Sequence, residues 1–443
     1  MKTVILGGGL TGVTLARLLN ERQEDTLVLE AQPHIGGLCR SVNIEGFTFD
    51  SGGSHIIFSR DKEVLGFMHS VLSDNIGFRN RDTKVFYKSK FVKYPFENGL
   101  SMLPKEDTFY CLNEFIRTLI ENEKGEGNKP ETFKDWIISN FGKGIGELYL
   151  IPYNEKIWKC KTEDMSLHWV EGRVPSPPVE DIIRSAVGIE TEGYTHQSVF
   201  AYPVNGGIEA LIHAIAEPVK DSIQTEYIVK SIRKDGKNWI ISDGEKTVYA
   251  DSIISTIPLQ SLIPCLEDVP LEVKDALANL RYNSLVSVFI GLKGETSPYS
   301  WVYIPGKEDG MMHRVAYLSN YSTNVAPPGY SAILAEITFN EGDEVSSMND
   351  TEIIANVIES MDKLNFINKE NVVFSGSARE PYAYVVYNLQ YEENLKVVKK
   401  FLKLLGIPLV GRFSQFEYLN MDACIRSVMD YLKERPVKVA DQE

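Results

Sequence analysis

The sequence predicts an α/β fold in which a domain with a parallel sheet is interrupted by a helical insertion and by an antiparallel β-sheet. Three observations predict this arrangement. The first 30 residues alternate strand, glycine turn, helix and strand. From about residue 223 the apolar residues recur with a period of two. Finally, 443 residues exceed the size of one ordinary domain.

The N-terminal segment predicts a βαβ unit. The run KTVILGG is a short strand, LTGVTLARLLNERQ has apolar residues at helical spacing, and TLVLEA is a second buried strand. Two strands joined by a helix over so short a distance lie parallel, with a right-handed crossover. This unit is typical of a Rossmann-type domain.

A glycine motif lies at the turn of this unit. Gly7, Gly9 and Gly12 satisfy the pattern G-x-G-x-x-G between the strand and the helix. Because glycines lack side chains, the backbone can approach a pyrophosphate that faces the helix N-terminus. Glu30, 18 residues after Gly12, can accept a ribose hydroxyl. Glycines also make ordinary turns, but in this context the motif predicts dinucleotide binding.

The middle of the chain predicts helices and then antiparallel strands. Six apolar residues between Phe109 and Ile120 form one helical stripe, and Thr132 is a candidate N-cap for a second helix. Between residues 223 and 255, Asp235-Gly236 and Asp243-Gly244 predict two hairpins. Residues 284–340 are again rich in strands, and the C-terminal tail returns to helix.

These elements predict three domains. The expected boundaries are 1–85, 200–262 and 372–443 for a discontinuous Rossmann-type domain, 86–165 for a helical domain, and 166–199 with 263–371 for the antiparallel sheet.

Composition excludes several classes of protein. A net charge of −15 and a pI near 5.1 argue against a general nucleic-acid-binding face. The five cysteines are widely spaced and never form C-x-x-C, and no histidines have metal-ligand spacing, so neither a disulfide framework nor a metal site is expected. No apolar run is long enough to span a membrane. We expect a cytoplasmic protein.

Further segments are shared by fewer protein families than the glycine turn is. They include a second glycine pair in GGLCRS (36–41) and seven longer stretches: GGSHIIFSR (52–60), KYPFENGLSMLP (93–104), GKGIGELYLIPYNEKIWKC (142–160), MSLHWVEGRV (165–174), SWVYIPG (300–306), HRVAYLSNYS (313–322) and GRFSQFEYLNMD (411–422). Taken together and in order, they resemble the flavin-dependent UDP-galactopyranose mutases. The eukaryotic-type branch is most similar, although the last stretch is closer to the bacterial branch.

This resemblance implies an FAD enzyme that interconverts UDP-galactopyranose and UDP-galactofuranose. In that family only the reduced flavin is active, and its N5 attacks the anomeric carbon, displaces UDP and forms a flavin–sugar adduct. NAD(P)H is the suggested reductant. The expected ligand is a small nucleotide sugar, and the sequence gives no oligomeric state.

The resemblance also implies a set of site residues. Arg173 and Arg314 would hold the diphosphate, and His55 would lie against the flavin. The expected substrate-binding residues are Tyr94, Glu97, Asn154, Trp158, Tyr303, Tyr384 and Tyr418. The expected FAD-binding residues are Gly7, Gly9, Gly12, Glu30, Gly36, Gly37, Leu38, Gly53, Ser54, Val229, Gly411, Arg412, Asn420, Met421 and Asp422.

Alternatives remain open at this point. Trp158 is equally compatible with a buried core, His55 with a structural role and Arg314 with a salt bridge. Glu97 stands where the eukaryotic-type enzymes carry glutamine; since a carboxylate only accepts hydrogen bonds, the base or the sugar would differ. An FAD-dependent oxidase or desaturase of the amine oxidase or protoporphyrinogen oxidase group is the main alternative function, and a binding protein without catalysis is a third.

Overall fold

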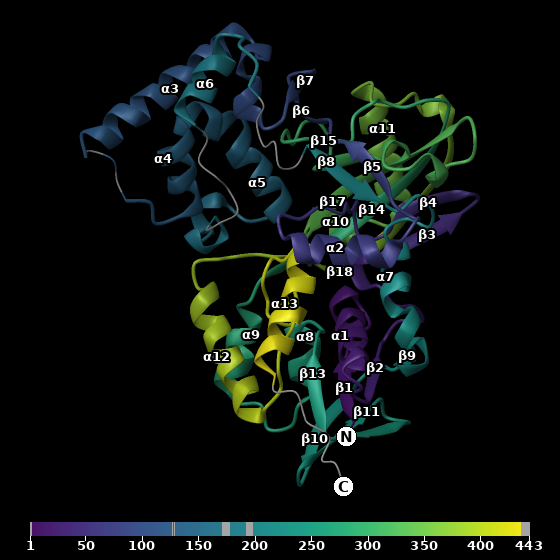
Figure 1. Cartoon of the computed structure of the whole chain (residues 1–443). Coiled ribbons are helices and arrows are strands. Elements are labelled where there is room, and N and C mark those ends of the chain that lie inside the picture. Colours follow the sequence, from purple (N-terminus) through teal and green to yellow (C-terminus); the bar gives the residue numbers. More distant parts are fainter. Residues whose placement is uncertain (1, 126, 128, 171–177, 192–197, 436–443) are drawn as a thin grey trace.

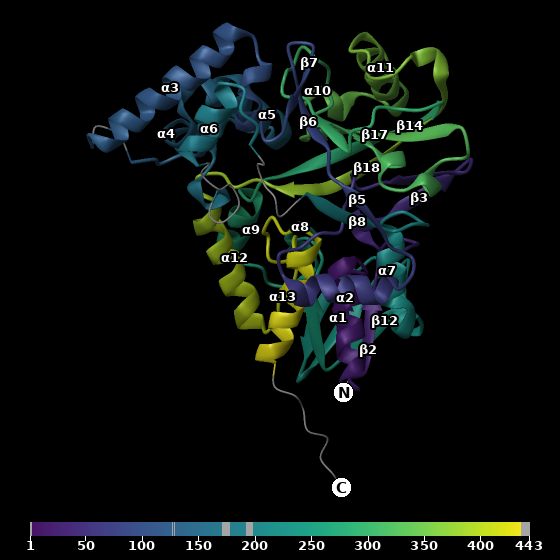
Figure 2. The same cartoon turned by 45° about the horizontal axis from the view of Figure 1, so that its top comes forward.

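A computed structural model describes residues 2–125, 127, 129–170, 178–191 and 198–435. Figure 1 shows three parts that meet near the centre of the molecule. The parallel sheet and its helices lie at the bottom, a group of helices at the upper left, and a large sheet at the upper right. Figure 2 shows the same division after a rotation.

The predicted βαβ unit is confirmed. β1 (Thr3–Leu6) and β2 (Thr26–Leu29) pair in parallel on either side of α1 (Leu10–Glu21), and the sheet order is β13-β1-β2-β9. All four residues of β1 are buried, as expected for a parallel strand covered on both faces. The remaining elements of this sheet and its cover are β9 (Ile223–Gln224), β13 (Ser252–Ser255), α7 (Glu209–Ala216) and α13 (Met421–Glu434).

Both predicted hairpins are also confirmed. β10 (Ser231–Asp235), β11 (Asn238–Ser242) and β12 (Thr247–Ala250) form an antiparallel three-stranded sheet. Gly236 and Gly244 have φ angles of +62° and +96° at the two turns, a backbone region that glycine adopts without strain. The chain then enters β13, which pairs with β1.

The large sheet has seven strands in the order β18-β14-β17-β16-β15-β6-β7. It is antiparallel except where β15 meets β6, and α11 (Asp350–Lys363) contacts β14 and β18. Its strands are β6 (Thr83–Tyr87), β7 (Lys90–Lys93), β14 (Tyr282–Lys293), β15 (Trp301–Tyr303), β16 (Arg314–Tyr317), β17 (Tyr330–Phe339) and β18 (Val372–Val385). The sheet predicted within 284–340 therefore extends beyond that range.

Two expected boundaries cross this sheet. The boundary at residues 85 and 86 divides β6, and the boundary at 371 and 372 separates β18 from the rest of the sheet. The physical reason is long-range pairing: β18 runs along nearly the whole of β14, which local sequence patterns do not reveal.

The helical part contains α3 (Lys105–Glu123), α4 (Phe133–Ile145), α5 (Ile151–Trp158) and α6 (Val179–Ala186). The predicted cap at Thr132 is confirmed as a capping box with Asp135. α3 and α4 approach closely, since a Cβ at Gly144 would lie 2.5 Å from the Cα of Cys111. The predicted stripe on α3 is only partly buried: Phe109 is 69% and Ile120 49% exposed.

The remaining α-helices and strands pack within or between these parts. They are β3 (Ser41–Ile44), β4 (Phe47–Asp50), β5 (Gly77–Asn80), β8 (Val199–Tyr202), α2 (Lys62–Leu72), α8 (Leu259–Leu262), α9 (Leu271–Ala278), α10 (Glu344–Ser347) and α12 (Tyr391–Leu405). Within the described ranges, no helix combines the length and apolar character needed to cross a membrane.

A buried carboxyl group lies in the 3₁₀ helix that precedes α3. Glu97 is only 4% exposed, and burial raises its pKa to about 7. At higher pH this side chain carries a charge away from water, which opposes folding.

Replacing Glu97 by glutamine should therefore stabilise the protein at pH 8. The folded state keeps the Glu97 proton up to about pH 7, whereas the unfolded chain loses it near its ordinary pKa of about 4.3, so the glutamate's contribution worsens across that window. The gain at pH 8 should not exceed about 4 kcal/mol and should vanish near pH 4. Thermal unfolding at several pH values measures it.

An exposed glutamate of α3 provides the control, because Glu121→Gln should leave the pH dependence of unfolding unchanged. If Glu97→Gln and the unsubstituted protein lose stability in parallel between pH 5 and pH 8, the buried carboxyl is not the cause.

Candidate active site

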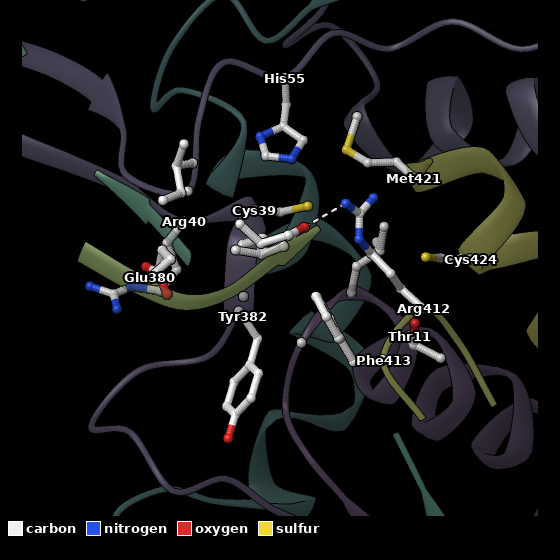
Figure 3. Close-up of a pocket in the computed structure, with 18 of the residues that line it drawn as sticks. Thr11, Cys39, Arg40, His55, Glu380, Tyr382, Arg412, Phe413, Met421 and Cys424 are labelled. Atoms are coloured by element: carbon white, nitrogen blue, oxygen red, sulfur yellow. Dashed lines mark hydrogen bonds between the residues drawn. The ribbon is translucent and has the colours of Figure 1, made fainter. Parts of the chain in front are cut away.

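One cavity of about 760 Å³ lies between the parallel sheet and the seven-stranded sheet. Its lining includes the glycine turn after β1, the segments around residues 36–40 and 52–58, part of β18, and the chain that leads into α13. Figure 3 shows how side chains from these distant segments converge on the cavity. The cavity therefore joins the predicted dinucleotide motif to the segments on which the mutase resemblance depends.

The glycine turn leaves the start of α1 open. Gly9 is the N-cap of α1 and offers no side chain to its free amides. Gly36 donates a backbone hydrogen bond to the carbonyl oxygen of Gly8, so the second glycine pair lies against the first. Gly7, Gly9, Gly36 and Gly37 all line the cavity. The surface has room for a pyrophosphate at a helix N-terminus.

Gly12 has a different role from its neighbours. It does not line the cavity, and a Cβ there would lie 1.9 Å from the carbonyl oxygen of Gly7. Gly411 likewise lies outside the lining, with φ at +88° and a Cβ position 2.3 Å from Thr11 Oγ1. Both glycines allow close backbone packing beneath the cavity.

Glu30 lies directly after β2 and lines the cavity near Val229. Its carboxylate accepts hydrogen bonds from the backbone amides of Gly8, at 2.6 Å, and Gln32, at 2.8 Å. A carboxylate has further lone pairs, so a ribose hydroxyl can still bind. Leu38 and the backbone beside it complete this end of the lining.

Arg412 extends into the cavity from the segment before α13. It donates hydrogen bonds to the carbonyl oxygens of Leu419 and Ala383, and Figure 3 shows one hydrogen bond of the arginine as a dashed line. Its Nε is buried without a hydrogen-bond partner among the described residues. The guanidinium lies 4.4 Å from the ring centroid of Tyr418. Asn420, Met421 and Asp422 line the cavity beside it.

The loop before His55 is held by buried carboxylates. The amide of His55 donates to Asp50 Oδ2 at 3.3 Å, and the amide and hydroxyl of Ser54 both donate to Glu336 Oε1 at 3.1 Å. Nδ1 of His55 lies 2.7 Å from the carbonyl oxygen of Gly53 and so carries the proton. Burial lowers the pKa of His55 to about 4, so the ring is neutral near pH 7. His55 and Ser54 line the cavity, whereas Gly53 does not.

Arg314 combines a salt bridge with a place in the cavity lining. Its Nε and Nη2 bind the two oxygens of Glu336 at 2.8 and 2.6 Å. Glu336 is fully buried, while 20% of the Arg314 side chain remains exposed. The salt-bridge interpretation is therefore correct, yet it leaves donors of the guanidinium free to face a ligand.

Four expected tyrosines surround this end of the cavity: Tyr94, Tyr303, Tyr384 and Tyr418. Tyr384 and Tyr418 stack with their ring centroids 5.9 Å apart, and Tyr94 lies 5.1 Å from Tyr303. Burial raises the pKa of Tyr384, so its phenol keeps its proton and can donate a hydrogen bond.

Three other expected residues lie outside the lining. Trp158 is 2% exposed, and its indole donates to Asn154 Oδ1 at 3.0 Å. Its ring packs edge-on against Tyr384 and Tyr418, so this pair lies one layer behind the cavity wall. Glu97 is buried elsewhere. The expected direct contact of these three with a ligand has no support in this geometry, and Arg173 lies outside the described residues.

The structure adds residues that the sequence interpretation missed. Arg81 lines the cavity, with its guanidinium 4.9 and 4.7 Å from the ring centroids of Tyr94 and Trp301. No local pattern marks it. Glu336 does have a signal, because a carboxylate within the apolar run SAILAEITF requires a buried partner.

The described part of the chain contains neither a disulfide nor a metal centre. All five cysteines, each within the described ranges, are free. Among the described histidines, cysteines and carboxylates, no group of three or more could hold a metal ion.

Comparisons with known proteins agree with this geometry. The chain aligns over 98% of its length with 95% of the crystal structure of reduced UDP-galactopyranose mutase, at a TM-score of 0.87 and 26% sequence identity. The predicted resemblance to these mutases and the predicted α/β architecture are thus confirmed.

Curated relatives match shorter regions. The chain is 22% identical to pseudooxynicotine dehydrogenase of Pseudomonas sp over 268 residues, which are 58% of the chain and 52% of the relative. It is 22% identical to dTDP-fucopyranose mutase of Escherichia coli over 176 residues, 37% of the chain and 43% of the relative. The chain thus spans about half the length of these two relatives.

A family model covers most of the sequence. The family described as flavin containing amine oxidoreductase matches residues 10–394. This range runs from the start of α1 into α12 and includes most of the cavity lining. The chain belongs to the flavin-containing amine oxidoreductase family.

Proposed function

We propose that this protein is an FAD-dependent mutase that interconverts the pyranose and furanose forms of a nucleotide hexose, UDP-galactose or a close relative. One observation carries the proposal: Arg314 faces the cavity lined by the glycine turn, fixed by Glu336 and surrounded by tyrosines. The similarity to two mutases of nucleotide sugars supports it.

The residues around the glycine turn fit FAD. The side-chain-free contact between Gly9 and Gly36–Gly37 would accept a pyrophosphate, and Glu30 would accept a ribose hydroxyl. The guanidinium of Arg412, which lines the cavity, would donate to the flavin. Asn420, Met421 and Asp422 would border the same group. When bound and reduced, the flavin would supply a nucleophilic nitrogen, N5, for the anomeric carbon of the sugar; NAD(P)H is the proposed reductant.

The chain itself would hold the diphosphate. Arg314 would donate to its oxygens, and the phenols of Tyr303, Tyr384 and Tyr418 would add neutral hydrogen bonds. Arginine suits this position because its planar fork never deprotonates. Arg173 is proposed for the same role from sequence resemblance alone.

Local charge outweighs the net charge of the chain. At −15 the protein repels a dianion at long range, but exposed carboxylates beyond about 8 Å are screened at physiological salt. A desolvated hydrogen bond to a charged group contributes about 1.5–3 kcal/mol. Hydrogen bonds from Arg314 to a diphosphate therefore outweigh the diffuse surface charge, although Glu336 balances the charge of the arginine itself.

The hydrogen-bond donors at this end of the cavity argue against an amine oxidase. A substrate amine is a cation near pH 7 and can only donate hydrogen bonds, and the guanidinium groups of Arg314 and Arg81 that line the cavity are donors as well. Neither arginine offers such a substrate an acceptor. The aromatic walls formed by Tyr94 and Trp301 would instead cover a neutral sugar and exclude water.

Product analysis tests the proposal directly. The dithionite-reduced protein, incubated with UDP-galactopyranose and dTDP-fucopyranose in parallel, should convert at least one of them to its furanose, resolved by chromatography. Oxygen uptake with amines, together with no isomerisation of either nucleotide sugar, would establish the oxidase alternative.

Replacing Arg314 by lysine should lower kcat/KM about 10- to 150-fold, because a point charge cannot reproduce the fork that binds Glu336 and diphosphate at once. FAD content should be unchanged, since Arg314 binds no part of the glycine turn. Arg117→Lys, which alters an exposed ion pair on α3, is the matched control and should keep full activity. Loss of FAD from Arg314→Lys would make the arginine a folding residue.

His55 should act as a neutral acceptor throughout the working pH range. Because burial lowers its pKa to about 4, its ring resonances should not titrate between about pH 5 and pH 8. NMR of histidine-labelled protein, assigned with a His55→Gln variant, measures this. A titration midpoint near pH 6.5 would contradict the buried, neutral ring.

A further inference from the structure

Glu336 joins two parts of the cavity through one carboxylate. It lies on β17 opposite Arg314 of β16 and is fully buried. Oε1 accepts from Arg314 Nε at 2.8 Å and from the amide and hydroxyl of Ser54, each at 3.1 Å; Oε2 accepts from Arg314 Nη2 at 2.6 Å. Arg314 Nη2 also approaches the carbonyl oxygen of Ser54 at 3.4 Å, which closes the network.

The loop that Glu336 holds also reaches the dinucleotide end. A Cβ at Gly52 would lie 2.2 Å from the carbonyl oxygen of Leu38, so the backbone of this loop packs directly on the second glycine segment. Two residues later, Ser54 binds Glu336, and His55 lines the cavity. The loop 52–55 is thus in contact with both ends of the cavity.

An anion that binds Arg314 must change the hydrogen bonds between the guanidinium and Glu336. In the structure the carboxylate neutralises Arg314, and the same Oε1 holds Ser54. A diphosphate would compete with Glu336 for the positive charge of Arg314. This competition would alter the hydrogen bonds that Ser54 donates to Glu336. Coupling between two sites is reciprocal. A change at the dinucleotide end that moved the loop 52–55 would therefore also change the interaction between Glu336 and Arg314.

We propose that Glu336 is a positioning residue that couples diphosphate binding at Arg314 to the loop 52–55 beside the flavin. The inference rests on the proposed function, because it takes the cavity to hold FAD and a nucleotide diphosphate. It assigns Glu336 no contact with either. A purely structural ion pair would instead contribute to folding and leave the two ends of the cavity independent.

The affinity for UDP in the two redox states of the holoprotein tests the coupling. If flavin and Arg314 communicate, oxidised and reduced protein should differ in UDP affinity by about fivefold or more. In Glu336→Gln the amide nitrogen would face a guanidinium donor, so the coupling should disappear and the two affinities should agree within about twofold. Anaerobic ultrafiltration with labelled UDP measures both values.

Three controls separate coupling from folding. Glu336→Asp keeps the charge on a shorter side chain, so its ratio of UDP affinities in the two redox states should lie between those of the wild type and Glu336→Gln. If Glu336→Gln does not fold, the ratio of Glu336→Asp is compared with that of the wild type instead. Asp350→Asn removes the carboxylate partner of Arg379, an arginine on β18 of the same sheet, and should leave the ratio unchanged. Every variant that is compared should retain its FAD and show a cooperative unfolding transition above the assay temperature. Glu336→Gln should melt at a lower temperature than the wild type, because it leaves the buried charge of Arg314 without its partner.

The outcomes are distinct. A wild-type ratio of one, or a ratio in Glu336→Gln equal to that of the wild type, would overturn the inference and leave the proposed function standing. Failure of the wild-type protein to bind UDP in either redox state would overturn the proposed function, and the inference with it.

Discussion

The bidentate ion pair between Arg314 and Glu336 is the constraint on which the site depends. A charged guanidinium at a partly dry cavity wall is costly unless a carboxylate holds it, and breaking such a pair by removing one partner costs roughly 3–5 kcal/mol. The sheet supplies the solution, because β16 and β17 place the two side chains directly opposite each other. The positive group is therefore fixed before any ligand arrives, which is what preorganised binding requires.

The segment PYNEKIW supports this site from behind. Trp158 is tied to Asn154 and packs on Tyr384 and Tyr418. Lys156 donates to the carbonyl oxygens of Ile304 and Gly306, directly after Tyr303, and burial lowers its pKa to about 7. These contacts hold the helical part against the sheet and pack the rings of Tyr384 and Tyr418 from behind. Residues of a sequence motif can therefore shape a binding site without contacting the ligand.

Local signals predicted local structure well. The βαβ unit, the capping box at Thr132 and the hairpin turns at Gly236 and Gly244 each depend on a few neighbouring residues, and each is present. Long-range pairing was not predictable: β18 joins the sheet through β14, about 90 residues earlier. The same limit applies to the site. Arg81 enters it through tertiary contacts alone, the sequence marks Glu336 as buried without identifying its partner, and Trp158 lies behind the wall that its motif suggested it would form.

A crystal structure of the reduced holoprotein with UDP would show whether Arg314 binds the diphosphate. Diphosphate oxygens should lie within hydrogen-bond distance, about 2.7–3.1 Å, of the Arg314 guanidinium, with FAD on the glycine turn and Glu336 still binding the arginine from behind. A nucleotide bound elsewhere, with Arg314 facing only Glu336 and solvent, would contradict this prediction.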